Sequence, residues 1–168
     1  LVSSKLVARA GGRRRFSASG GGPLAADIAR FFYAAGLPIM EGYGLTETSP
    51  VITVNGFGRA RFGTVGKVVP GVEVKIAADG EILTRGPNVM KGYWRNPDAT
   101  GQTVRDGWLH SGDIARIDAE GYVYLCDRLK DMVVSGGTNI YPREVEVVLL
   151  EHPDIVDVAV IGVPNEEF

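Results

Sequence analysis

Residues 24–35 show the hydrophobic spacing of an amphipathic helix. The apolar positions that recur at this spacing are Leu24, Ile28, Phe31, Phe32 and Ala35. Pro23 stands near the start of the segment and Gly36 follows its end, as is typical of helix boundaries. The next apolar segment, residues 39–43, predicts a short buried strand that runs into a glycine-rich loop.

The central part of the chain has the two-residue period of strands. Residues 72–76 alternate strictly between apolar and polar side chains, and residues 81–85 follow after an Asp-Gly turn. This pattern predicts a β-hairpin. A second hairpin is predicted between residues 114–117 and 122–125. Residues 60–127 are therefore expected to form a small antiparallel sheet or a distorted barrel.

The pattern changes after Arg128. Residues 132–134 predict a short strand, Pro142 opens a predicted helix, and residues 156–163 predict a buried strand. Strand, helix and strand in this order are the start of a small α/β unit. The fold class expected for the whole chain is therefore mixed α/β.

Composition and charge narrow the range of partners. A chain of 168 residues with 45% hydrophobic residues and a net charge of −2 gives no reason to expect nucleic acid. One local cluster is basic: Arg9, Arg13, Arg14 and Arg15. It is either a solvated surface or a contact for an anion or a peripheral membrane surface.

Cys126 is the only cysteine, so no disulfide can form within the chain. This is consistent with a reducing, cytoplasmic compartment. Because Cys126 lies in a predicted strand, we interpret it as a small buried side chain. No apolar run reaches the roughly 18 residues that a membrane-spanning helix needs.

A glycine-bounded segment carries the first candidate chemistry. Between Gly42 and Glu47 the sequence reads Gly-Tyr-Gly-Leu-Thr-Glu, with Gly44 after the tyrosine. Tyr43 can stack on adenine, Thr46 can donate a hydrogen bond to a phosphate oxygen, and Glu47 can bind Mg²⁺ through oxygen. Taken alone, the motif is also compatible with a simple turn that exposes a glutamate.

Gly20, Gly21 and Gly22 connect a strand-like stretch to the first predicted helix. Glycine allows the backbone to approach a flat ligand closely, and a helix N-terminus favours negative charge. A plain strand-to-helix turn would have the same sequence.

Asp113 and Arg128 are two further candidates for nucleotide binding. A carboxylate can accept from two adjacent hydroxyls, so a ribose diol is a natural partner for Asp113. The guanidinium of Arg128 suits ribose or phosphate oxygens. The structural alternatives are a turn aspartate and a salt bridge from Arg128 to Asp127 or Asp131.

Three other side chains are interpreted as structural. His110 is expected to be a surface or packing histidine. Tyr93 and Trp94 are expected to pack in the core or between domains rather than to form a ligand cage.

Four short motifs follow one another in a fixed order. They are residues 43–47, 111–113, 127–131 and 135–137. In this order and at these distances they closely resemble the ANL superfamily of acyl-adenylate-forming enzymes. That superfamily includes AMP-forming acyl-CoA synthetases, adenylation domains and firefly-type luciferases. The resemblance runs from about Phe16 to the last residue.

The resemblance implies further roles. It places the Gly20–Gly22 segment beside the adenine and acyl pockets and gives Asp113 the ribose. It makes Lys130 the hinge about which a small C-terminal domain rotates. It brings Gly136 and Gly137 close to the pantetheine arm of CoA.

The same resemblance divides the chain into three parts. Residues 1–127 would be the C-terminal part of the large adenylate-forming domain, residues 128–131 the hinge, and residues 132–168 an incomplete small domain. The family also carries an upstream phosphate-binding loop and a C-terminal catalytic lysine, and neither matches anything here. We therefore expect a fragment that does not turn over substrate alone.

The implied reaction joins a medium- or long-chain fatty acid to CoA through an acyl-adenylate. It consumes ATP with Mg²⁺ and CoA, and releases AMP and pyrophosphate. One alternative is an adenylating enzyme that loads a carrier protein. Another is a degenerate paralogue that binds nucleotide or an acyl ligand and regulates.

Overall fold

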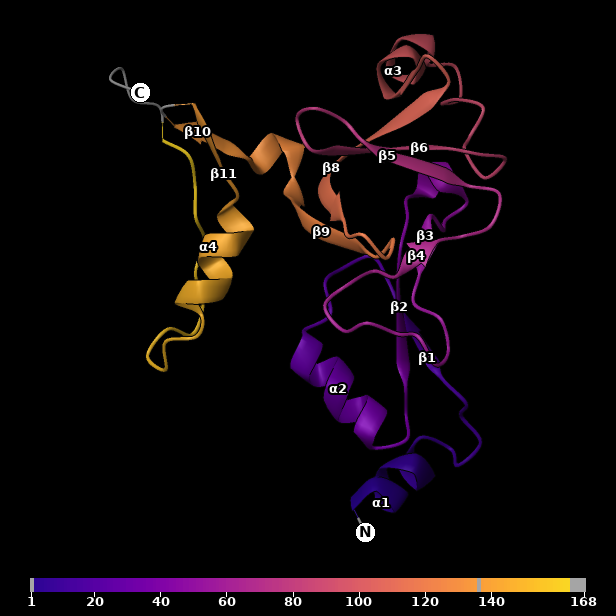
Figure 1. The fold of residues 1–168 in the computed structure, drawn as a ribbon, viewed down its shortest axis with the longest axis vertical. Coiled ribbons are helices and arrows are strands. Elements are labelled where there is room, and N and C mark those ends of the chain that lie inside the picture. The colour runs from indigo at the N-terminus through magenta and orange to yellow at the C-terminus, as the bar shows by residue number, and fades with distance from the viewer. Residues whose placement is uncertain (1, 136, 164–168) are drawn as a thin grey trace.

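The computed structural model of the chain describes residues 2–135 and 137–163. Figure 1 follows the chain from α1 (Val2–Arg9), which the sequence pattern did not predict, through two larger sheets to α4 (Pro142–Leu149). The architecture is mixed α/β with few helices, as expected from the sequence.

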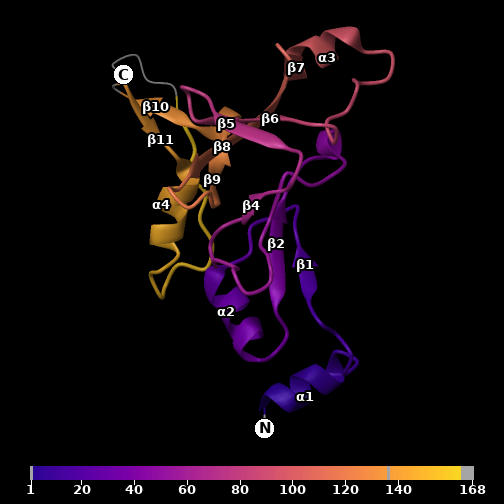
Figure 2. The same cartoon turned by 45° about the vertical axis from the view of Figure 1, so that its right-hand side comes forward.

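The first sheet is built around a β–α–β unit. β1 (Ser17–Ser19) and β2 (Ile39–Tyr43) are parallel neighbours, and α2 (Ala26–Ala34) connects them. β3 (Thr53–Val54) and β4 (Lys67–Val68) extend the sheet in the order β1-β2-β3-β4. Figure 2 shows β1, β2 and β4 of this sheet from a second direction. The carboxyl ends of β1 and β2 therefore lie at the same edge, next to the two glycine-rich loops.

The helix predicted over residues 24–35 is confirmed over a shorter span. Ala25 has φ −60° and ψ 132°, outside the helical region, so α2 begins after it. At the other end Gly36 has φ +79°, which lets the chain turn out of the helix. The strand predicted over residues 39–43 is confirmed residue for residue.

The second sheet has five strands. They are β5 (Glu73–Ile76), β6 (Glu81–Arg85), β7 (Val104–Arg105), β8 (Trp108–Ile117) and β9 (Val123–Arg128). The order is β5-β6-β8-β7, and β9 also pairs with β8. Both predicted hairpins are confirmed as antiparallel pairs. Within the described ranges the sheet stays open and does not close into a barrel. The short helix α3 (Pro97–Thr103) precedes β7 and is capped by Asn96, whose side chain accepts from Ala99 N at 3.1 Å.

β8 is the central strand and is irregular in two places. Its pairing with β6 shifts register between Glu81 and Leu83, and its pairing with β9 shifts between Ile114 and Ala115. Such irregularities re-aim side chains and are frequent next to functional sites. Here they flank Asp113, which pairs with Arg128 in the β8–β9 ladder.

One cluster of buried side chains joins the two sheets. Its members are Tyr43, Ile52, Val65, Ile82, Ala115 and Val123. Val65 N donates to Val123 O at 3.0 Å, and Val123 N donates to Gly66 O at 2.9 Å. The loop before β4 is thereby attached to the start of β9.

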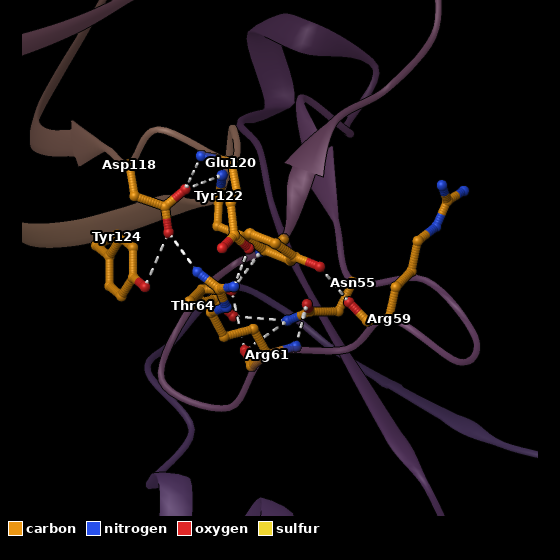
Figure 3. A network of polar contacts seen from close by, with 9 residues as sticks. Asn55, Arg59, Arg61, Thr64, Asp118, Glu120, Tyr122 and Tyr124 are labelled. Atoms are coloured by element: carbon orange, nitrogen blue, oxygen red, sulfur yellow. Dashed lines mark hydrogen bonds and ion pairs between the residues drawn. The ribbon is translucent and has the colours of Figure 1, made fainter.

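A polar network fixes the same loop from the outside (Figure 3). Arg61 lies at its centre, with Nη1 2.6 Å from Asp118 Oδ2 and a second ion pair to Glu120. The buried Asn55 donates to Thr64 O at 2.7 Å and accepts from Arg61 N at 3.0 Å. The exposed ion pairs add little stability, whereas the satisfied buried amide defines the path of the loop.

The last described part of the chain contains η2 (Leu129–Asp131), β10 (Val133–Ser135), β11 (Thr138–Ile140) and α4. β10 and β11 form a two-stranded antiparallel sheet. The short strand predicted near residues 132–134 and the helix opening at Pro142 are both confirmed. Throughout the described part, every helix is too short or too polar to cross a bilayer.

The buried strand predicted over residues 156–163 is wrong. Val156, Ile161 and Val163 are 95%, 76% and 75% exposed. A strand needs a neighbour to pair with, and none of the described strands pairs with this segment. Its Val160 N donates instead to Glu146 Oε1 at 3.1 Å, so the segment follows α4 as a loop.

Gly66 offers a direct test of how closely the loop before β4 is packed. It has φ +82°, and an added Cβ would lie 2.1 Å from the carbonyl carbon of Val54. We expect Gly66→Ala to lower the free energy of unfolding by about 3 kcal/mol or more, because backbone cannot move aside. Urea denaturation measures this change.

Gly121 is the matched control for that test. It has φ +84°, but no atom lies within 4 Å of an added Cβ. Gly121→Ala should cost only about 1 kcal/mol, the strain of a left-handed alanine. Equal losses in the two variants would show that the tight approach at Gly66 is unimportant.

Candidate nucleotide-binding site

A cleft of about 1580 Å³ opens at the carboxyl ends of β1 and β2. Its walls come from the loops after these strands, the end of β9, η2 and the start of α4. The predicted site residues that line it are Gly21, Gly22, Gly42, Tyr43, Gly44, Asp113, Arg128 and Lys130. This edge of a parallel strand pair is where ligands of open α/β sheets bind.

The centre of the cleft is a buried carboxylate with two partners. The Tyr43 hydroxyl donates to Asp113 Oδ2 at 2.6 Å, and Arg128 Nε lies 2.9 Å from Asp113 Oδ1. The Asp113 side chain is 8% exposed, whereas that of Arg128 is 57% exposed. A buried carboxylate is tolerated only when paired in this way.

The Asp113 carboxylate can accept further hydrogen bonds. A carboxylate has about four lone-pair positions, and these two contacts use one on each oxygen. One position on each oxygen is left, which matches two adjacent hydroxyls. The geometry therefore suits a vicinal diol such as that of ribose.

Tyr43 is held in its protonated form. Burial raises the pKa of its phenol, and the hydrogen bond to Asp113 and the charge of Asp113 raise it further. The phenol therefore remains a donor to Asp113 at neutral pH. Its ring belongs to the buried cluster between the sheets, so the core itself fixes the position of this donor.

The glycines of the two loops differ in their backbone conformation and in the space around them. An added Cβ at Gly44 would lie 1.6 Å from Pro50 O, so this position excludes any side chain. At Gly21 φ is +80°, with open space around the position. Gly20 is not among the residues that line the cleft, but lies beside Gly42, whose carbonyl oxygen would be 3.3 Å from an added Cβ.

Thr46 and Glu47 lie in η1 (Thr46–Thr48), beyond the residues that line the cleft. Glu47 Oε1 accepts from the Tyr93 hydroxyl at 2.7 Å, and Glu47 O accepts from Met90 N at 2.7 Å. The segment around Tyr93 therefore orients the candidate metal ligand. Trp94 was expected to pack in the core or between domains, and the first of these is wrong, because Trp94 is 86% exposed.

The donor set fits a magnesium ion that is shared with phosphates. Among residues 2–135 and 137–163 no group of three His, Cys, Asp or Glu side chains is arranged to hold a metal alone. Mg²⁺ commonly binds one or two carboxylates together with substrate phosphates. Glu47 can supply such a carboxylate.

The other residues singled out in the sequence differ in their position relative to the cleft. Lys130 lies in η2 and lines the cleft. Gly137 has φ +79° and does not line the cleft, while Gly136 lies outside the described residues. Cys126 is partly buried, and this burial raises the pKa of its thiol.

Two buried glutamates near the site were not predicted. Glu41 lines the cleft, accepts from Leu24 N at 3.2 Å, and has a pKa raised by its burial. The two-residue period of β2 places it on the same face as Tyr43, which is a signal that the sequence contained. Glu81 contacts His110, three residues before Asp113. No comparable pattern in the sequence marks the Glu81–His110 pair.

Comparison with known proteins agrees with this geometry. The family model for "AMP-binding enzyme" matches residues 3–94, more than half of the chain. The chain belongs to the AMP-binding enzyme family. The resemblance drawn from the four motifs is thereby confirmed.

Relatives of this chain include a long-chain-fatty-acid–CoA ligase, FadD15, of Mycobacterium bovis. The two are 45% identical over 163 residues, which are 96% of this chain and 27% of the relative. A feruloyl-CoA synthase of an Amycolatopsis species is 45% identical over 160 residues, 87% of this chain and 32% of the relative. The chain thus spans about a third or less of the length of these curated relatives.

Solved structures share the fold. ATP-bound MatB from Rhodopseudomonas palustris superimposes with a TM-score of 0.83 at 40% identity, over 93% of this chain and 34% of that protein. The O-succinylbenzoate CoA synthetase MenE from Bacillus subtilis, in complex with ATP and magnesium, gives 0.79 at 34% identity. That match covers 96% of this chain and 38% of MenE.

The raised pKa of Tyr43 predicts that the stability of the chain depends on pH. Above about pH 10 the phenol ionises in the unfolded chain but stays protonated in the folded one, so the folded state binds more protons. The contribution of Tyr43 to the free energy of unfolding should therefore be fully present below pH 10. Above pH 10 the free energy of unfolding should fall, by up to about 1.4 kcal/mol per pH unit. Tyr43→Phe should flatten this part of the curve. Parallel curves for the two proteins, measured by denaturant unfolding from pH 8 to 11, would contradict the burial of a protonated donor.

Proposed function

We propose that this chain forms part of an AMP-forming acid–CoA ligase that activates a fatty acid. The observation that carries the proposal is the buried Asp113 carboxylate, held by Tyr43 and Arg128 at a cleft bordered by the glycine loops. The ligases among the relatives support the choice of CoA over a carrier protein as acceptor. Free ATP and CoA as substrates would fit a cytoplasmic location.

The candidate residues differ in the part of the nucleotide or metal that each contacts. Asp113 accepts from the ribose hydroxyls, and Arg128 binds ribose or phosphate oxygens from the rim of the cleft. Tyr43 orients Asp113 through its hydroxyl and offers its ring to adenine. The backbone of Gly20–Gly22 approaches the nucleotide, Thr46 donates to a phosphate oxygen, and Glu47 holds Mg²⁺.

The reaction would proceed in two steps. First, a carboxylate oxygen of the acid attacks the α-phosphorus of ATP, and the bond to the leaving pyrophosphate breaks. Then the CoA sulfur attacks the acyl carbon, the thiol proton is lost, and AMP leaves with the electrons of the broken C–O bond. Mg²⁺ would supply charge neutralisation at the phosphates in the first step. The residues here bind and orient the nucleotide for both steps.

We further propose a domain division at η2. Residues 1–127 would belong to the large domain, residues 128–131 to a hinge centred on Lys130, and residues 132–168 to the small domain. Arg128 is the last residue of β9, and η2 follows at once, so a rotation about Lys130, beyond the last ladder pair, would move the small domain and leave the β8–β9 ladder in place. Gly136 and Gly137 would lie close to the CoA arm.

Acid-dependent exchange between ATP and pyrophosphate tests the proposed function. The full-length protein that contains this chain should catalyse exchange with fatty acids of one length class and without CoA. Asp113→Ala should raise the KM for ATP by about 10- to 100-fold, because hydrogen bonds to a charged group are lost. Asp98→Ala, an exposed aspartate in α3, is the control and should leave the KM unchanged.

Two outcomes would contradict the proposal. Absence of exchange with every acid, in a folded protein, would favour a non-catalytic nucleotide-binding or acyl-binding role. Exchange restricted to aromatic acids would support adenylate formation but contradict a fatty acid as the substrate. A feruloyl-CoA synthase is among the relatives.

Tyr93→Phe tests the role of Glu47 as a metal ligand. Removing the hydroxyl leaves Glu47 Oε1 without its 2.7 Å donor, so the carboxylate loses its fixed orientation. Loss of such an outer partner typically weakens metal affinity about 10- to 100-fold. We expect weaker Mn²⁺ binding to the ATP complex, measured by electron paramagnetic resonance. Tyr124→Phe, which removes a contact to the distant Asp118, is the control. Equal Mn²⁺ affinity in wild-type and Tyr93→Phe proteins would refute this arrangement.

A further inference from the structure

Glu81 is a buried carboxylate whose two oxygens both contact the segment before Asp113. His110 Nδ1 lies 2.6 Å from Glu81 Oε2, and Gly112 N donates to Glu81 Oε1 at 2.8 Å. The side chains of Glu81 and His110 are 6% and 21% exposed. Neither residue lines the nucleotide cleft.

Further hydrogen bonds attach the same segment to β6. The Ser111 hydroxyl donates to Ile82 O at 2.7 Å, and Asp113 N donates to Ser111 Oγ at 3.0 Å. Gly112 has φ +72°, a conformation that favours glycine. Each residue from His110 to Asp113 therefore takes part in at least one of these hydrogen bonds, through its side chain at His110 and Ser111 and through its backbone N–H at Gly112 and Asp113.

These contacts coincide with the irregularities of β8. The β6–β8 register shifts between Glu81 and Leu83, and the β8–β9 register shifts between Ile114 and Ala115. A regular ladder would not need a buried carboxylate, and burying one is costly unless it is fully paired. Glu81 satisfies a backbone donor that the irregular ladder would otherwise leave without a partner.

We propose that Glu81 is a positioning residue, which acts through His110 and Gly112 to hold Asp113 in the orientation that receives both ribose hydroxyls. This rests on the proposed function, in which Asp113 binds ribose. Glu81 does not touch the nucleotide. Its loss would therefore be detected as a loss of ribose recognition.

The test compares ATP with 2′-deoxyATP and 3′-deoxyATP as ligands of the full-length protein. Dissociation constants are measured by calorimetry, together with the KM for the acid in pyrophosphate exchange. Glu81→Ala should weaken ATP binding by about 10-fold or more and lower the preference for ATP over both deoxynucleotides by a similar factor. The KM for the acid should not change.

Two variants separate positioning from general damage. Glu81→Gln should retain most of the preference for ATP over the deoxynucleotides. Its amide oxygen can accept from Gly112 N, and its amide nitrogen can donate to an unprotonated ring nitrogen of His110. Glu73→Gln removes the charge of an exposed ion pair to Arg85 in the same sheet and should have no effect. If Glu81→Ala does not fold, His110→Ala provides the same comparison.

The outcomes are distinct. A preference for ATP that survives in Glu81→Ala, or equal losses for ATP and the deoxynucleotides, would overturn the positioning role. A wild-type protein that binds ATP and the deoxynucleotides equally would instead refute the ribose role of Asp113, and with it the basis of the proposed function.

Discussion

The structure depends on one buried charge, the carboxylate of Asp113. It lies 70 residues along the chain from Tyr43 and receives that side chain's hydroxyl, while Arg128 approaches from the adjoining strand. Because an unpaired carboxylate at this depth would be strongly destabilising, the three elements that carry these groups must stay together. The interaction therefore contributes to the packing of the fold as well as to the chemistry of the cleft.

The same charge connects the core to the predicted hinge. The ring of Tyr43 lies in the buried cluster between the two sheets, and Arg128 is the last residue before η2. Whatever binds between Tyr43 and Arg128 thus contacts both the rigid core and the point where the chain leaves it. If the chain divides at η2 as proposed, this is a physical route from nucleotide binding to the orientation of the proposed small domain.

Periodic patterns allowed much of the fold to be predicted from the sequence. α2, β2, both hairpins and α4 follow from local spacing and boundary residues, which a single sequence displays. The segment of residues 156–163 was mispredicted because an apolar run does not reveal whether a neighbouring strand exists to pair with it. The roles of Tyr43, Asp113 and Arg128 were proposed from motif order, but their convergence needs contacts across long separations. Glu81 and the Tyr93–Glu47 contact were missed because no local pattern marks a side chain that acts through another.

A crystal structure of the full-length protein with AMP would test the central claim most directly. AMP contains the adenine, the ribose and the α-phosphate, and so all the groups assigned to this cleft. We expect both ribose hydroxyls at about 2.6–3.2 Å from the Asp113 carboxylate, with Tyr43 and Arg128 still in contact with it. Ribose bound elsewhere, with Asp113 contacting only Tyr43 and Arg128, would show that this buried carboxylate is structural and contradict the account.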